Sequence, residues 1–266
     1  MTGLTHDAVA RYERDGILFP IAVLSAAETA RFRASFDALA RQLGDPKAMD
    51  LGQCHLFFRW AYELATFPAV LDAVEAVIGS DILIHSSRIF PKYPRDRGVI
   101  SWHQDGHYWE LDEPRLVSAW IALTDSTPEN GCMRVVPGSH RQRVPHQSRP
   151  APDKILASGL EVAVEVDEGD ALDVALCAGE MSLHHVNIIH GSKANPSDRE
   201  RIGFAVRYVS PLARQAIEHH EVLLVRGRDT AHHYRHGTPP NEDGAAAIAA
   251  HAAFHAAPSP RRTATA

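Results

Sequence analysis

The sequence contains little cysteine: Cys54, Cys132 and Cys177 are the only three, and they lie far apart. An odd number of scattered thiols does not form the dense disulfide framework that stabilises small secreted domains. The first residues also lack the basic segment and apolar stretch of a signal peptide. These absences indicate a reducing compartment, and we expect the protein to be cytoplasmic.

Several other patterns are absent as well. No apolar run approaches the ~20 residues that a membrane-spanning helix needs. Lysine and arginine are scattered through a chain whose formal net charge is −6, so there is no basic stripe for nucleic acid. The chain has no internal repeat and no H-E-x-x-H helix of the kind that binds zinc in metalloproteases. We therefore expect a small-molecule substrate, and neither a membrane nor a nucleic acid, as partner; the oligomeric state stays open.

What is present fits an ordinary globular protein. The chain has 266 residues, of which 45% are hydrophobic and 23% charged, enough for one large domain with a full core. We expect that domain to span residues 1–257, with a helical part at 5–79, a β core at 80–211 and a loop and helix at 212–257. Residues 258–266 contain two prolines and two arginines, and we expect a disordered tail there.

Helix signals dominate the N-terminal part. A helix over Thr5–Glu13 starts at a capping threonine and is stopped by Gly16. A second over Ser25–Leu43 opens with a capping box, because Glu28 stands three positions after the serine. A third is predicted over Pro68–Ile78.

Short β segments separated by turns begin at residue 80. The predicted strands are 15–20, 81–85, 116–123, 133–136, 161–166, 171–176, 180–185 and 201–209. Helices followed by many strands favour a mainly β fold with flanking helices over an alternating βαβ fold. Beyond residue 211, the segment 222–227 is either a strand or a loop, and the alanine-rich segment 244–257 predicts a helix.

Histidine is abundant, at 17 residues, and the pair His103 and Asp105 is the most informative. Two positions apart on an extended strand, both side chains project from one face and can bind one metal ion. An imidazole from a distant strand, His190, would complete a two-histidine, one-carboxylate set with open positions, which is typical of non-haem Fe(II) oxygenases. Taken alone, H-x-D is common by chance, and a surface strand with two polar residues is the alternative.

The choice of the second histidine depends on its neighbours in the chain. His185 is an alternative to His190, but only His190 precedes Gly191 and Ser192. The glycine allows a close backbone approach, and the serine hydroxyl can bond a carboxylate oxygen. We therefore expect His190 at the site and His185 in a packing or supporting role.

Arg201 is the candidate for binding an organic acid. A guanidinium can form a bidentate pair with a carboxylate. Its charged neighbours Arg199 and Glu200 permit a surface interpretation instead. However, a strand that starts at Arg201 puts Gly203 on the same face, together with Ala205 and Arg207, and the small side chains leave room for a ligand.

Four motifs in fixed order carry a resemblance to a known family. They are Ser101–Trp109 (SWHQDGHYW), Glu129–Met133 (ENGCM), Val136–His140 (VPGSH), and His190–Ser192 (HGS) with Arg201. Together they resemble the phytanoyl-CoA dioxygenase family, over roughly residues 5–211. The resemblance implies a double-stranded β-helix, the jelly-roll, cupin-like core of that family.

The resemblance also implies roles for individual residues. His103, Asp105 and His190 would bind Fe(II). Arg201 would hold the distal carboxylate of 2-oxoglutarate, helped by Ser192 and by Trp120. Related halogenases replace the carboxylate ligand with a small residue so that chloride can bind. Because Asp105 is present here, oxygen transfer is favoured over halogenation.

The activity implied is that of an Fe(II)- and 2-oxoglutarate-dependent dioxygenase. Such an enzyme uses O2 to hydroxylate an unactivated C–H bond and releases succinate and CO2. We expect a small polar metabolite as substrate: an aminophosphonate, an amino acid or a secondary-metabolite scaffold. Desaturation, epimerisation or cyclisation by the same enzyme class stays open. A non-catalytic cupin-like binding protein and a zinc hydrolase on the same triad are the alternatives from other classes.

Candidate substrate contacts lie on two parts of the chain. His107, Tyr108 and Trp109 come directly after the metal-binding motif and would line the substrate side, although aromatic residues also fill barrel mouths. Arg59 and Arg88 are candidates for binding an anionic substrate group. A solvated or structural arginine is the alternative for each.

Overall fold

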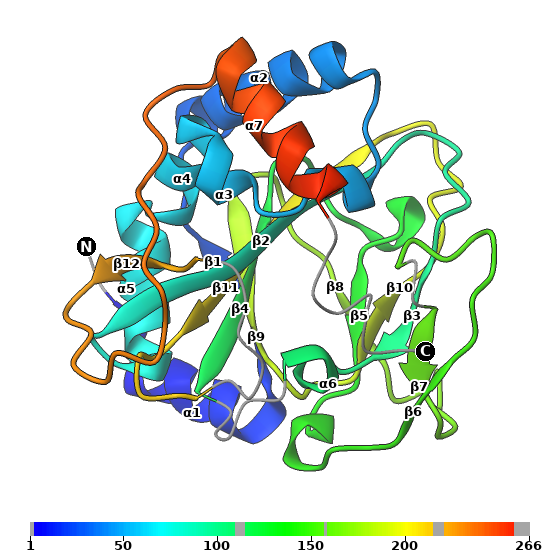
Figure 1. Ribbon diagram of the computed structural model, residues 1–266. Coiled ribbons are helices and arrows are strands. Elements are labelled where there is room, and N and C mark those ends of the chain that lie inside the picture. Colours follow the sequence, from blue (N-terminus) through cyan, green and yellow to red (C-terminus); the bar gives the residue numbers. More distant parts are fainter. Residues whose placement is uncertain (1–2, 110–114, 157–158, 215–220, 258–266) are drawn as a thin grey trace.

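A computed structural model describes residues 3–109, 115–156, 159–214 and 221–257. Two antiparallel sheets face each other, and most of the helices pack on the outer side of the larger sheet (Figure 1). The tail expected to be disordered, 258–266, lies outside the described residues.

The N-terminal helices begin and end close to the residues that their capping signals predict. Helix α1 (His6–Asp15) begins after Thr5, whose side chain accepts a hydrogen bond from the Ala8 amide, and it ends at Gly16 in the left-handed conformation. The predicted capping box starts α2 (Ala26–Leu43), because the Ser25 amide donates to the Glu28 carboxylate over 2.7 Å. Helix α5 (Pro68–Ile78) has its predicted bounds.

Three short helices between α2 and α5 have no predicted counterpart. They are η1 (Ala48–Leu51), α3 (Cys54–Phe57) and α4 (Arg59–Ala65). Segments of one or two turns are too short to show a helical period, so only tertiary packing defines them. The later helices are α6 (Gly106–Trp109), η2 (Pro128–Asn130), η3 (Ser139–Arg141) and α7 (Ala245–Ala256), the last of which confirms the predicted C-terminal helix.

The strands form two main sheets and one small hairpin. The major sheet has the order β1 (Ile17–Ala22), β9 (Glu180–His185), β4 (Leu116–Ala122), β11 (Arg201–Val209), β2 (Ile82–Lys92), β12 (Leu223–Arg226). The minor sheet has the order β3 (Ile100–His103), β10 (His190–Ser192), β5 (Met133–Val135), β8 (Leu172–Val174). A separate hairpin joins β6 (His146–Ser148) and β7 (Leu160–Val162).

Strands β2 to β5 and strands β8 to β11 alternate between the two main sheets, and the hairpin of β6 and β7 lies between these two runs. Along the chain, β2, β4, β9 and β11 belong to the major sheet, and β3, β5, β8 and β10 belong to the minor sheet. This alternation of antiparallel strands is the double-stranded β-helix, so the expected jelly-roll core is confirmed. The two sheets lie side by side in Figure 1, with the minor sheet on the right.

Strand bounds agree with the predictions where the apolar pattern is strong. Strands β9 and β11 have their predicted bounds, and the segment 222–227 forms a strand, β12. The prediction for β2 was wrong at its end, because the strand continues from residue 85 to Lys92 through polar residues. Strands β7 and β8 are shorter than predicted, and β6 was not predicted at all.

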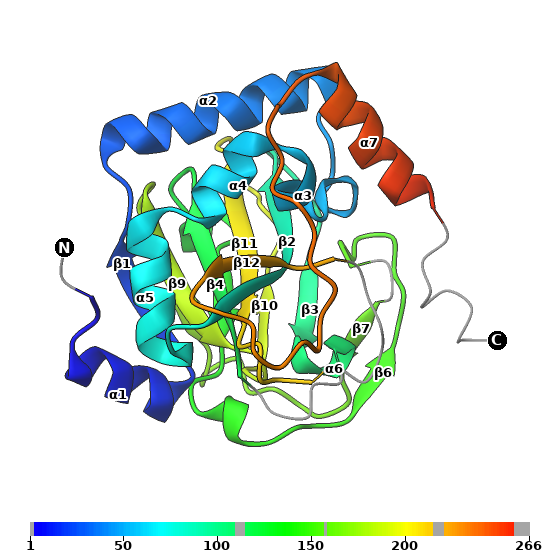
Figure 2. The ribbon, with the colours of Figure 1, turned by 60° about the vertical axis from the view of Figure 1, so that its left-hand side comes forward.

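Residues on the two faces of the major sheet pack in different environments. On β11, Ile202 and Phe204 belong to the core that the sheet forms with the outer helices. Helices α2, α4 and α5 cover this side of the major sheet (Figure 2). Ala205 faces inward and packs with Trp120 of β4 and with apolar residues of the minor sheet. The prediction that Arg201 and Ala205 share one face of this strand is therefore consistent with the packing.

Candidate metal centre

Two strands of the minor sheet meet at a pair of histidines. His103 ends β3, and His190 begins β10 directly opposite it in the register. Asp105 Oδ1 lies 3.4 Å from His103 Nε2 and 3.9 Å from His190 Nε2. All three side chains are buried, and in the part of the chain that the structure describes they are the only such histidine–carboxylate group with ligand atoms within 4.8 Å of one another.

The geometry differs from the expectation in one respect. Strand β3 ends at His103, so the prediction that Asp105 lies on the same strand was wrong. Asp105 lies in the turn that leads into α6, where its carbonyl accepts a hydrogen bond from the Tyr108 amide. The turn, and not strand alternation, brings the carboxylate to the two imidazoles.

Backbone contacts fix the tautomer of both histidines. His103 Nδ1 lies 2.9 Å from the Ser101 carbonyl, and His190 Nδ1 lies 3.0 Å from the Ile188 carbonyl. A carbonyl only accepts, so each Nδ1 carries a proton, and in the neutral ring each Nε2 has its lone pair on the side of Asp105. Metal-binding histidines in proteins show this arrangement, and the residues therefore fit a divalent metal.

The charges of the triad suit a cation as well. Burial lowers the pKa of His190 to about 4, so its ring is neutral at neutral pH. Burial raises the pKa of Asp105, but the nearby Arg207 guanidinium opposes this effect, and the pKa lies well below its usual range. A neutral imidazole and an ionised carboxylate are the forms that bind metals.

Gln104, between the two ligand candidates, organises the surrounding loops. Its side-chain amide donates to the carbonyls of Gln142 and Asn187 over 2.8 and 2.6 Å, and its oxygen accepts from the Val144 amide. Sequence reasoning missed this role, because the partners lie on loops with no periodic pattern.

Arg201 is a buried cation on the inward face of the major sheet, the face that also carries Ala205. Arg201 is 2% exposed and donates to the Gly131 carbonyl over 2.7 Å. Its guanidinium carbon lies 5.3 Å from the centre of the Trp120 ring. Gly203 makes room for this indole, since a Cβ at that position would lie 1.8 Å from the ring.

Lys92, which sequence reasoning did not identify, faces Arg201 across β2 and β11. It is fully buried, and its Nζ donates to Ser192 Oγ over 2.8 Å. Burial and then the charge of Arg201 lower the pKa of Lys92 to about 6. Among the residues described, no carboxylate forms an ion pair with either cation. A buried guanidinium beside a buried amine, with no acid between them, favours binding of an anion, which would restore the charge of Lys92.

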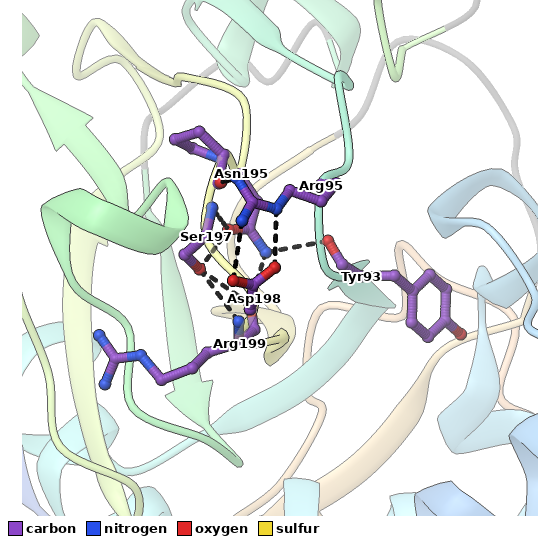
Figure 3. Close-up of polar contacts among 7 residues, drawn as sticks. Tyr93, Arg95, Asn195, Ser197, Asp198 and Arg199 are labelled. Carbon is purple, nitrogen blue, oxygen red and sulfur yellow. Dashed lines mark hydrogen bonds and ion pairs between the residues drawn. The ribbon is translucent and has the colours of Figure 1, made fainter.

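A loop network fixes the strand ends that carry this lysine–arginine pair. The Asn195 side-chain amide donates to the carbonyls of Tyr93 and Arg199 over 2.9 and 2.7 Å, and Arg95 forms a two-bond ion pair with Asp198 (Figure 3). Asn195 is fully buried. The end of β2 is thereby held against the start of β11.

The aromatic candidates on α6 have different surroundings. The Tyr108 ring centre lies 6.2 Å from that of His103, and Trp109 lies 5.6 Å from the guanidinium carbon of Arg207. The exposed His107 ring stacks on His146, 4.3 Å away. All three lie next to the triad in the chain, and Tyr108 also packs near one of its rings.

The two candidate arginines have separate positions. Arg88 is on β2 opposite Ala205, on the inward face, and its Nη1 donates to the Ala48 carbonyl over 2.8 Å. Arg59 starts α4 on the outer side of the sheet, is 60% exposed and pairs with Glu63. The structure brings Arg88 to the inward face but does not bring Arg59 there.

The neighbouring histidines remain outside the triad. His185 Nδ1 accepts a hydrogen bond from the Asn187 amide, which agrees with a supporting role. His184, which points the other way from β9, has its ring centre 5.0 Å from that of His190. The preference for His190 over His185 agrees with this geometry.

Known proteins share this architecture. Residues 12–203 match the family model described as Phytanoyl-CoA dioxygenase (PhyH). An ectoine dioxygenase of Nocardia farcinica is 28% identical over 216 residues, 71% of this chain and 72% of that protein. A probable alpha-ketoglutarate-dependent hypophosphite dioxygenase of Stutzerimonas stutzeri is 30% identical over 185 residues, 66% of this chain and 64% of that protein.

A solved structure extends the likeness to nearly the full length. The apo form of the non-heme monooxygenase ThoJ superposes with a TM-score of 0.80 at 33% sequence identity. The superposition covers 91% of this chain and 92% of that one. The helices outside the β core are therefore part of the shared architecture.

Proposed function

This chain belongs to the phytanoyl-CoA dioxygenase family of Fe(II)- and 2-oxoglutarate-dependent oxygenases, and from that premise we propose that it hydroxylates an unactivated C–H bond of a small polar metabolite. O2 is the second cosubstrate, and succinate and CO2 are released. The observation that carries the proposal is the triad of His103, Asp105 and His190, with both Nε2 lone pairs directed at one carboxylate oxygen. In this proposal these three residues hold the iron.

The buried cations on the major sheet would bind 2-oxoglutarate. Arg201 and Lys92 would share its distal carboxylate, and Ser192, which accepts from Lys92, would add its hydroxyl. Trp120 covers the guanidinium and excludes water from it. Burial strengthens each of these charge–charge contacts, because solvent screening is weak there.

When bound, iron supplies the activation of O2 coupled to oxidative decarboxylation of the keto acid. The residues of this chain would orient the metal ligands, keep them in the required protonation state and shield the substrate. The Ser101 and Ile188 carbonyls keep the two rings in the required tautomer, and Arg207 keeps Asp105 ionised. The side chains on α6 would shield the substrate side.

Other outcomes of the same chemistry remain alternatives. Desaturation, epimerisation or cyclisation would use the same triad and the same cations. A non-catalytic binding protein or a zinc hydrolase would have no need of the buried Lys92–Arg201 pair. The two relatives act on ectoine and, in the probable assignment, hypophosphite, both small polar molecules, which supports a screen of amino acids, aminophosphonates and secondary-metabolite scaffolds.

The test is an anaerobic titration of metal-free protein with Fe(II) and 2-oxoglutarate, monitored by visible absorption. Chelation of iron by the keto acid gives a weak charge-transfer band, which we expect for the wild type and not for His103→Ala. Arg59→Gln, which removes an exposed arginine on the outer side, is the control and should retain the band. Iron binding without a band would favour the binding-protein alternative.

We also propose a cytoplasmic location and one domain over residues 1–257, with no nucleic acid as partner. Within the described ranges, no helix is both long and apolar enough to cross a membrane. The scattered basic residues of an acidic chain support the absence of a nucleic-acid surface.

A further inference from the structure

Three polar residues form a row across neighbouring strands of the major sheet. His184 of β9 is opposite Ser118 of β4, and Ser118 is opposite Arg207 of β11. Directly opposite residues of a sheet project from the same face. The row, His184–Ser118–Arg207, therefore presents an imidazole, a hydroxyl and a guanidinium side by side.

Every member of this row has a buried polar atom that has no hydrogen-bond partner among the residues that the structure describes. These atoms are His184 Nδ1, Ser118 Oγ and Arg207 Nε. Ser118 is fully buried and His184 is 2% exposed. Native proteins pair nearly all such groups, so three adjacent exceptions on one face indicate a place that a ligand completes.

The row lies beside the metal triad. Arg207 Nη2 is 3.5 Å from Asp105 Oδ2, and the His184 and His190 ring centres are 5.0 Å apart. The row is separate from the proposed 2-oxoglutarate site, because Arg207 follows Arg201 by six residues on β11, about 20 Å at the ~3.3 Å per residue of a strand. The cosubstrate, near Arg201, and a ligand of the row, near Arg207, would thus lie at different positions along β11.

The charge beside the row is positive. Arg88 of β2 is opposite Ala205, two residues before Arg207, and therefore lies on the same inward face as Arg207. Burial, together with the charge of Arg207, lowers the pKa of Arg88 to about 10. In the described segments Arg88 forms no ion pair, and its Nη1 is bonded to the Ala48 carbonyl. The carboxylate paired with Arg207 is Asp105, whose charge the metal would share.

We propose that the row His184–Ser118–Arg207, with Arg88 beside it, binds an oxyanion group of the primary substrate, a carboxylate or a phosphonate. Arg207 Nε–H and the Ser118 hydroxyl donate to the oxyanion, and Arg88 adds charge. His184 Nδ1, which has no partner among the described residues, offers a further hydrogen bond. This proposal rests on the proposed function and narrows the substrate to an acid.

Anchoring the acid here has a consequence for the reaction. Arg207 contacts Asp105 through Nη2 while Nε is left for the ligand, so one side chain links the substrate to the metal site. A C–H bond a few atoms from the oxyanion would then lie next to the triad. A neutral substrate would leave the polar groups of the row without hydrogen-bond partners. The oxyanion of an amino acid or an aminophosphonate would supply these partners.

The test uses protein loaded with Ni(II) and 2-oxoglutarate, which keeps the cosubstrate site filled and avoids turnover. Calorimetry with methylphosphonate, acetate and neutral acetamide as probes should show binding of at least one anion and none of the amide at equal concentration. Saturation by methylphosphonate and not by acetate would identify a phosphonate substrate, and the reverse would identify a carboxylate. Equal binding of the amide, or no binding of either anion, overturns the proposal.

Variants locate the binding. Ser118→Ala and Arg88→Gln should each raise the Kd of the anion at least tenfold. Arg59→Gln, the same change at an exposed ion-paired arginine, should leave this Kd unchanged. Unchanged affinity in both inward-facing variants overturns the proposal. Arg207→Lys, with folding checked by circular dichroism, keeps a charge beside Asp105 and should still weaken the anion.

The two hypotheses fail differently. Loss of the Fe(II)–2-oxoglutarate band with anion binding retained in the Ni(II) protein would refute the proposed function alone. A normal band with no anion binding would refute this inference alone.

Discussion

Lys92 and Arg201 face each other across β2 and β11, and both are buried without a carboxylate partner among the described residues. Lys92 Nζ reaches Ser192 on the minor sheet, so the pair joins the two sheets. In the free protein, repulsion from the buried Arg201 guanidinium disfavours the ammonium form of Lys92, because water is excluded from the site. A dicarboxylate would relieve that repulsion.

Lys92→Met should therefore affect binding and stability in opposite directions. We expect the Kd for 2-oxoglutarate to rise about 10- to 100-fold, the cost of losing a hydrogen bond to a charged group. The metal-free variant should be no less stable than the wild type, because an amine whose charged form is disfavoured by burial is replaced by an apolar side chain of similar length. The charge-transfer titration and thermal unfolding measure the two effects. An unchanged Kd would exclude Lys92 from the cosubstrate site.

Binding of 2-oxoglutarate should also depend on pH. Burial lowers the pKa of Lys92 to about 6, so the free protein has a neutral amine at pH 8. A bound carboxylate favours the ammonium, so binding takes up a proton and the affinity falls as the pH rises above 6, by at most about tenfold per pH unit. Calorimetry in buffers of different ionisation enthalpy measures the number of protons taken up on binding. Lys92→Met should abolish this dependence.

Gly203→Ala tests the contact between Trp120 and Arg201. The added methyl group would lie 1.8 Å from the indole, which must move. We expect a loss of about 1–3 kcal/mol in the free energy of unfolding, typical of overpacking, and weaker binding of 2-oxoglutarate. Urea unfolding measures the first effect. Gly244→Ala, where the nearest neighbouring atom would be 3.7 Å from the new methyl group, is the matched control; equal stability of both variants would contradict the contact.

Asp105→Ala should remove hydroxylation and most of the iron affinity. The same change leaves Arg207 without its carboxylate partner, so the cavity left by the side chain should attract an anion such as chloride. Metal content by mass spectrometry and chloride dependence of the absorption band check the two outcomes. Asp7→Ala, in the first turn of α1, is the control. Wild-type turnover in Asp105→Ala would show that Asp105 is no ligand.

The metal-free protein should lose stability on mild acidification. Burial lowers the pKa of His190 to about 4 and that of His184 well below 6.5. Between pH 6.5 and 4 the unfolded chain binds protons that the folded chain does not, so the free energy of unfolding falls with falling pH, by at most about 1.4 kcal/mol per pH unit for each histidine. Denaturation at several pH values measures the slope. A flat profile would contradict the burial of neutral imidazoles.

The parts of the fold that sequence could predict are those with a strong local signal. Helix α5 and strands β9 and β11 have sharp apolar patterns and clear ends, and their bounds were right. The short helices α3 and α4 were missed, because tertiary packing defines them. Such elements leave no period in the sequence.

The candidate site was predictable where motif and chemistry coincide. His103, Asp105 and His190 were found through their residue types, although Asp105 reaches the group through a turn. Lys92 was missed because no predicted strand extended to it and it belongs to none of the recognised motifs. Arg207 and His184 belong to predicted strands, but only the register reveals that Ser118 lies between them.

The alternation of strands between the two sheets separates two tasks. His103 and His190 belong to the minor sheet, whereas Arg201 and the row that contains Arg207 belong to the major sheet. Substitutions on the inward face of β4, β9 or β11 can thus alter which acid is recognised while the metal ligands stay untouched. Such a division lets natural variation or directed evolution change selectivity without rebuilding the reactive centre.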